Sequence, residues 1–169
     1  METKNMETMT ALPELVAQAK EGAEQAKARL LRTFEFVPED KLRWSPSSSA
    51  RTALQIVAHC GLGNRAFAAI IRGEEMPLSG TPQEAAVQIR ASDVNPATRE
   101  EAVAMVEDSV AEVLEALDGV TDEMLDTTPT SPFGPLPFAY WMGLSSNHTG
   151  FHTAQIEYLQ TIWGDLESH

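Results

Sequence analysis

The chain has few basic residues and only one cysteine. It contains 12 Lys and Arg against 25 Asp and Glu, which gives a formal net charge of −13 at pH 7. Nucleic acids and anionic membrane surfaces attract proteins through basic patches, so we expect neither as a partner. The single cysteine, Cys60, permits no intrachain disulfide, and this fits a reducing, cytoplasmic compartment.

The sequence also lacks the marks of a targeting or membrane-spanning segment. Its first residues do not show the basic start and apolar run of a signal peptide. The longest apolar stretch, residues 53–71, is interrupted by His59, Asn64 and Arg65. Its small residues and helical periodicity suit a buried helix better than a membrane span. We therefore expect a soluble protein.

Alternation of polar and apolar residues, the pattern of a half-buried strand, is almost absent. Instead, apolar residues recur at helical spacing in four long segments, which predicts an all-α fold. The predicted helices span residues 11–36, 50–72, 97–117 and 136–163. Ser47, Ser48 and Ser49 are candidate caps for the second helix, and Gly73 ends it. With 43% hydrophobic residues, the chain is sized for one domain over residues 1–169.

The linkers between these helices differ in length, and the difference predicts a topology. Residues 73–96 form the longest linker, with a short helix expected near residues 83–89. Adjacent antiparallel helices need only about 2 to 8 linking residues. The longer linker is able to run the length of the bundle, so that the second and third long helices point the same way. We therefore predict a four-helix bundle with up-down-down-up order.

Only four histidines occur in the chain, and three fall on apolar faces of predicted helices. His148 and His152 are four residues apart, so both imidazoles lie on one face, within the apolar stripe of the last helix. His59 lies on the apolar face of the second helix, whereas His169 is the last residue. Burying an imidazole without a partner costs about 1 to 3 kcal/mol. A metal ion held by His59, His148 and His152 would supply that partner, and a hydrogen-bonded structural cluster is the alternative.

The neighbours of these histidines suggest supporting roles. Gln55 and Gln155 lie one turn from the predicted ligands, where they would orient the imidazoles or serve as ordinary polar residues of the bundle. Gly63 follows His59 by one turn and is expected to leave room for water or substrate. Cys60 is about 100° further round the helix than His59, so we interpret it as a small core residue rather than a ligand.

The order of these motifs resembles the DinB superfamily. The segment from Val37 to Pro46, with its Trp44-Ser45 pair, precedes the first histidine, and the His148-x-x-x-His152 pair follows near the C-terminus. The resemblance implies a four-helix bundle that holds a divalent metal, usually nickel or zinc, on three histidines matching His59, His148 and His152. It also implies several functions, because some relatives are transferases or isomerases that use low-molecular-weight thiols and many have no assigned reaction.

Three protein ligands leave a coordination position open to water or substrate, as in catalytic metal sites. Such an ion lowers the pKa of a bound water or thiol. Our leading hypothesis is therefore a metal-dependent enzyme acting on a small molecule, either a low-molecular-weight-thiol-dependent transferase or a hydrolase. The alternative is a non-catalytic, metal-binding stress-response protein whose metal is structural. Apolar linker residues Met76, Leu78 and Phe133 further suggest a homodimer.

Overall fold

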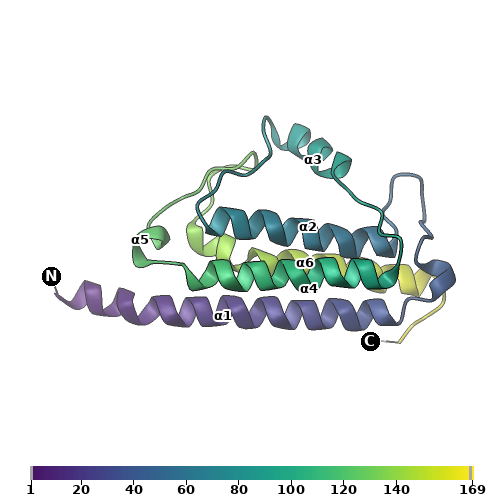
Figure 1. Cartoon of the computed structure of the whole chain (residues 1–169), viewed down its shortest axis with the longest axis horizontal. Helices are drawn as coiled ribbons and strands as arrows, with labels where there is room; N and C mark the ends of the chain where they lie inside the picture. The colour runs from purple at the N-terminus through teal and green to yellow at the C-terminus, as the bar shows by residue number, and fades with distance from the viewer. Residues whose placement is uncertain (1, 168) are drawn as a thin grey trace.

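The computed structural model describes the backbone of residues 2–167 and 169, and the side chains of residues 12–167 and 169. Four long helices lie side by side: α1 (Glu2–Glu35), α2 (Ala53–Ile71), α4 (Arg99–Asp118) and α6 (Phe138–Ile162) (Figure 1). Three short helices join them: η1 (Glu39–Lys41), α3 (Pro82–Ala91) and α5 (Asp122–Leu125). The described backbone contains no strand, which confirms the predicted all-α class.

The start of α2 differs from the prediction. Its cap is Thr52, whose side-chain oxygen accepts a hydrogen bond from the backbone of Gln55, while the Gln55 side chain accepts one from the backbone of Thr52. This reciprocal pair is a capping box. The prediction of a serine cap is wrong because Ser45 and Ser47 use their hydroxyls to close the preceding turn. The helix therefore begins three residues later than the predicted start at residue 50.

Contacts between helices establish their directions. In the hydrogen-bonded pairs between α2 and α4, the residue numbers of both helices increase in the same direction, from Asn64–Ser109 to Arg65–Glu112. These two helices are therefore parallel. In contrast, α2 and α6 run antiparallel, since Asn64 meets Ser145 whereas His59 lies beside His152. Figure 1 shows α1 and α6 running in one direction and α2 and α4 in the other. The predicted up-down-down-up order is confirmed.

Helix α2 packs against both α4 and α6, and 13 of its 19 residues are buried, more than in α4 or α6. A side chain at Gly61 would lie 2.9 Å from the backbone oxygen of Met105, so glycine permits the close approach of α2 to α4. By length and composition α2 is also able to cross a membrane, but 67% of its most apolar window is buried inside this fold. Such burial is typical of a core helix. The α2–α6 interface carries the candidate site.

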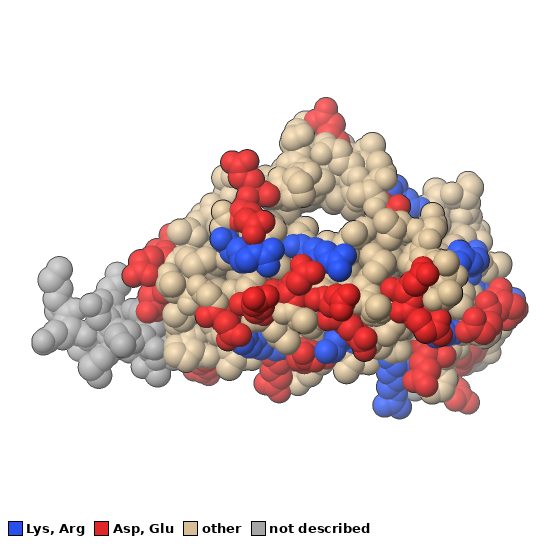
Figure 2. Space-filling view, viewed as in Figure 1, with Lys and Arg blue, Asp and Glu red and all other residues tan. Residues whose placement is uncertain are grey.

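Helix α3 lies away from the four long helices. Together with the rest of the 73–96 linker it passes over α2, and we call this segment the α3 arch (Figure 1). The helix lies within the long 73–96 linker, where the sequence predicts a short helix. A capping box formed by Thr81 and Glu84 defines its start. In its last turn, Arg90 donates to the backbone oxygen of Ser49, and after its end Asp93 binds Arg51, just before α2. Figure 2 shows an opening between this arch and the bundle.

Candidate metal centre

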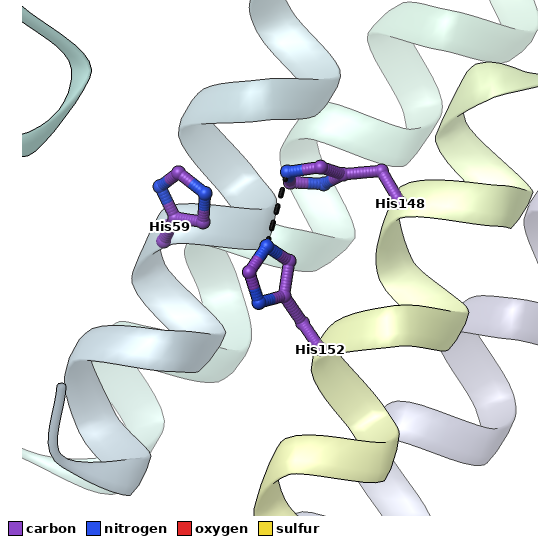
Figure 3. Close-up of side chains that lie close together, drawn as sticks. All are labelled: His59, His148 and His152. Carbon is purple, nitrogen blue, oxygen red and sulfur yellow. Dashed lines mark hydrogen bonds between the residues drawn. The ribbon is translucent and has the colours of Figure 1, made fainter. Parts of the chain in front are cut away.

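The structure brings His59, His148 and His152 together at the interface between α2 and α6 (Figure 3). Each offers a ring nitrogen, and the three nitrogens lie within 4.8 Å of one another. The Nε2 atoms of His148 and His152 are 3.2 Å apart. His59 comes from α2 and the other two residues from successive turns of α6. The fourth histidine, His169, instead contacts Asp165.

Glycine at position 63 makes room for one of these imidazoles. A Cβ atom at Gly63 would lie 2.8 Å from Cε1 of His148, closer than carbon atoms pack. The His148 ring fills the space directly beside Gly63, and the glycine also lines the pocket next to the histidines, where the sequence predicts room for water or substrate. The glycine serves the site in another way: it permits His148 to lie against α2, beside His59.

An aspartate that the sequence analysis did not identify supports His59. The Nδ1 atom of His59 is 3.4 Å from Oδ1 of Asp93, whose side chain is only 8% exposed. Asp93 also accepts hydrogen bonds from Arg51, at 2.8 and 3.1 Å, and from Arg90, at 2.7 Å. A carboxylate beside one ring nitrogen fixes the imidazole so that the other nitrogen faces the site. Nothing in the sequence distinguishes Asp93 from other acidic residues, because only the path of the linker brings it to His59.

The two glutamines proposed as supporting residues have different surroundings. Oε1 of Gln155 lies 2.8 Å from Nδ1 of His152, where it accepts the proton of that nitrogen. The Nε2 atom of His152 is then left with a lone pair that faces the site. Gln55 instead closes the capping box at the start of α2 and donates to Asn95 at 2.7 Å. Its helix-capping position directs it away from His59.

Burial keeps all three imidazoles neutral. Loss of hydration lowers the pKa of His59 to about 4 and that of His148 to about 3, and nearby positive charge acts in the same direction. Burial also lowers the pKa of His152, although its hydrogen bond with Gln155 opposes that change. Neutral imidazole is the form that binds metals, so the cluster is ready for an ion at pH 7 without releasing protons.

The donor set fits a transition metal such as zinc or nickel. Two nitrogens that bind a tetrahedral ion at about 2.0–2.1 Å lie roughly 3.3 Å apart, close to the separation of the His148 and His152 Nε2 atoms. The other ring nitrogen of His148, Nδ1, is buried without a hydrogen-bond partner among the described residues, so an ion on Nε2 would not satisfy it. Cys60 does not join the donor set, because burial raises the pKa of its thiol to about 12. It belongs to the apolar core, as the sequence predicts.

A pocket of about 760 Å³ opens beside the histidines, under the α3 arch. His59 and His148 form part of its wall, and Phe67 and Trp141 continue that wall along α2 and α6. Helix α3 contributes Ile89. A second hollow of about 710 Å³ lies between residues 73–80 and 124–132 and contains none of the three histidines. The first pocket therefore provides the space in which a small molecule would reach the cluster.

Several solved structures share this architecture. YfiT from Bacillus subtilis, described as a probable metal-dependent hydrolase with an unusual four-helix bundle topology, matches with a TM-score of 0.69 and 18% identity, over 88% of this chain and 87% of YfiT. A DinB-like protein from Bacillus subtilis matches with a TM-score of 0.64 and 13% identity, over 90% and 96% of the two chains. A conserved protein from Enterococcus faecalis gives 0.67 and 15%, over 88% and 96%. At these identities the likeness shows a shared fold.

Comparison at the level of sequence identifies the family. No curated protein matches the chain. The model of the DinB superfamily, however, matches residues 23–156, which extend from α1 into α6 and include all three clustered histidines. Since this match covers most of the sequence, the chain belongs to the DinB superfamily.

Proposed function

We propose that this protein is a metal-dependent enzyme that acts on a small molecule at the α2–α6 interface. The observation that supports the proposal most directly is the convergence of three neutral histidines beside a pocket of about 760 Å³. His59, His148 and His152 would hold a divalent ion, with nickel and zinc as the expected metals. When bound, such an ion acts as a Lewis acid and lowers the pKa of a coordinated water or thiol.

The surrounding residues hold and orient the donor set. Asp93 fixes the ring of His59, and its own position is held by Arg51 and Arg90. Gln155 places the proton of His152 on Nδ1. Because both arginines donate to the Asp93 carboxylate, we assign it a positioning role and not that of a general base. The described residues around the cluster offer no other carboxylate in contact with the histidines.

Two nucleophiles are compatible with this arrangement, and they correspond to two reaction classes. A water molecule would make the protein a hydrolase, the class described as probable for YfiT. A low-molecular-weight thiol would make it a transferase, the class implied by the family resemblance. Both need an anionic nucleophile at neutral pH, and an ion held by His59, His148 and His152 would favour the anionic form of either one. We propose the thiol-dependent transferase as the first activity to test.

The test is turnover by protein purified without a polyhistidine tag. Product formation from an electrophile such as a chlorodinitrobenzene, and from an activated ester, is measured with a panel of thiols and without thiol. Each reaction is repeated after metal removal by a chelator and after reconstitution with nickel or zinc. Thiol-dependent turnover that disappears with the metal and returns on reconstitution supports the transferase, and the same pattern without thiol supports the hydrolase.

A structural metal gives a different pattern in the same experiment. An ion bound by both α2 and α6 would link two neighbouring helices, so it would raise the melting temperature in either case. If metal removal lowers the melting temperature but no electrophile is turned over with any thiol or with water, the metal has a structural role. Failure of the untreated protein to contain or take up a divalent ion contradicts both proposals.

A further inference from the structure

The pocket beside the histidines has a wall with unusual composition for this chain. The sequence carries 25 acidic residues, yet no Asp or Glu lines the pocket among the described residues. Most of its surface comes from aliphatic and aromatic side chains, including Leu62, Phe67, Leu144 and Ile89. In a protein with net charge −13, a wall without carboxylates would not recognise a cation.

Positive charge at the pocket is also limited. Arg65 is the one Lys or Arg in the wall that the structure describes, and it donates to Glu112 at 3.0 Å. That ion pair leaves little charge for an anionic ligand. A divalent ion held by the three histidines would add positive charge, but only at that end of the pocket. The wall beyond the histidines therefore favours the uncharged, apolar part of a ligand.

The pocket is elongated along the bundle. On α2 its wall extends from His59 to Ala69, a distance of roughly 15 Å at about 1.5 Å per residue. His59 lies at one end of this wall. The His148 ring lies next to the His59 ring, with centroids 5.1 Å apart, and Phe67 stacks edge-to-face on the His148 ring with centroids 5.3 Å apart. A ligand that fills this space would place one end at the three-histidine cluster and the rest of its body along the apolar wall.

From these three observations we propose that the pocket binds a substrate whose body is elongated, uncharged and predominantly apolar. The proposal rests on the proposed function, since it describes the substrate of that same site. It excludes amino acids, sugar phosphates and polyamines as the molecule that lies along the wall, because they would bring charge or many polar groups against apolar side chains, whereas an anionic thiol or water would lie at the histidine end.

A pair of substitutions on α3 tests the proposal. Ile89 faces the pocket, whereas Val87, two residues earlier, is 69% exposed on the same short helix. Binding of the uncharged fluorophore N-phenyl-1-naphthylamine is measured for the wild type, Ile89→Glu and Val87→Glu, in metal-free and zinc-loaded protein. We expect saturable binding that weakens at least tenfold in Ile89→Glu and stays within twofold of the wild type in Val87→Glu.

A second pair of variants does not involve α3. Ala66→Phe fills the pocket from α2, and Ala111→Phe adds the same ring to the exposed face of α4, with helical content checked by circular dichroism. Loss of probe binding in Ala66→Phe alone supports the proposal. Equal binding in all variants, no saturable binding by the wild type, or tighter binding of a cationic probe overturns it. Metal retention is measured in parallel, so a protein that holds metal but binds no probe contradicts this proposal without contradicting the metal centre.

Discussion

Gly63 and His148 occupy one space: the imidazole of His148 lies where a side chain at position 63 would begin. The two residues come from antiparallel helices, α2 and α6, and their contact sets how far the His148 ring reaches toward His59. A methyl group at position 63 would approach the far end of the ring, which is able to move, and not a backbone atom. Position 63 therefore affects the site more than it affects the fold.

Gly63→Ala should raise stability and weaken metal binding. Alanine favours a helix over glycine by about 0.5–1 kcal/mol, and the imidazole of His148 can turn aside at little cost. That movement takes Nε2 of His148 away from His152, so we expect zinc affinity to fall at least tenfold. Gly150→Ala on α6 is the control, because an added Cβ there meets nothing within 4 Å. Competition with a chromophoric chelator measures the affinity, and unchanged affinity in Gly63→Ala would contradict the assignment of His148.

Replacing any of the three histidines with alanine should abolish metal retention and leave the bundle folded. Most helical stability in such a protein comes from packing of apolar faces, and these faces remain in His59→Ala, His148→Ala and His152→Ala. Elemental analysis of purified protein should give close to one divalent ion per chain for the wild type and none for the variants. His169→Ala is the control, since His169 lies outside the cluster. A variant that keeps a full equivalent of metal shows that its histidine is not a ligand.

The sequence predicts the helices and the three clustered histidines, but it does not predict the residues that position those histidines. Apolar spacing predicts α2 and α6, and four-residue spacing places His148 and His152 on one face. Asp93 has no such signal, because it reaches His59 through the linker after α3. The role of Gly63 depends on the facing helix, and the turn before Thr52 determines which residue caps α2. Helical periodicity predicts which face of a helix is buried, but it does not predict which atoms of the neighbouring segments lie against that face.

Asp93→Asn should weaken metal binding without unfolding the protein. The Asn side chain is close in size to that of Asp93, but its amide lacks the negative charge that orients Nδ1 of His59 and binds Arg51. Loss of such a supporting carboxylate typically costs 10–100-fold in metal affinity, and we expect a change in that range. Asp118→Asn is the matched control, because Asp118 forms an ion pair with Lys20 far from the cluster. If both variants lose the same amount of affinity, Asp93 has no specific role in positioning His59.

Acidification should destabilise the metal-free protein between about pH 6.5 and pH 4. In this window the unfolded chain binds a proton at each histidine, whereas folded His59, with its pKa lowered to about 4, does not. The stabilising contribution is therefore complete above pH 6.5 and is lost as the pH falls. For His59 alone the loss is on the order of 3 kcal/mol, at about 1.4 kcal/mol per pKa unit.

Urea unfolding at pH 7, 6 and 5 measures this effect. The wild type is compared with His59→Gln, which cannot titrate, so the many carboxylates of the chain contribute equally to both proteins. We expect the free energy of unfolding to fall less steeply for His59→Gln, by up to about 1.4 kcal/mol per pH unit in the steepest part of the window. Parallel curves for the two proteins would show that the pKa of His59 is not lowered in the folded state.

Helix α6 also presents an uncovered apolar face, and we propose that two copies of the chain pair through it. The helix carries one charged residue, Glu157, which binds Arg29 of the same chain at 2.9 Å. Phe151, Tyr158 and Ile162 share one side of the helix and are 74%, 68% and 46% exposed. The linker residues Met76 and Leu78, by contrast, are partly covered within the chain, where they line the pocket under α3.

A second copy is the favoured occupant because a chain of net charge −13 repels itself wherever its carboxylates meet. The exposed face of α6 has few charges, so two copies can meet there without that repulsion. An interface built on aromatic side chains is also little affected by salt. Phe151→Glu should therefore convert a dimer to a monomer, while Val87→Glu, an equal change of charge on exposed α3, should leave the dimer intact. Sedimentation velocity at low micromolar concentration and two ionic strengths measures both. A monomeric wild type at both ionic strengths contradicts the proposal, and a dimer that dissociates in high salt shows that charged residues, not this face, hold the copies together.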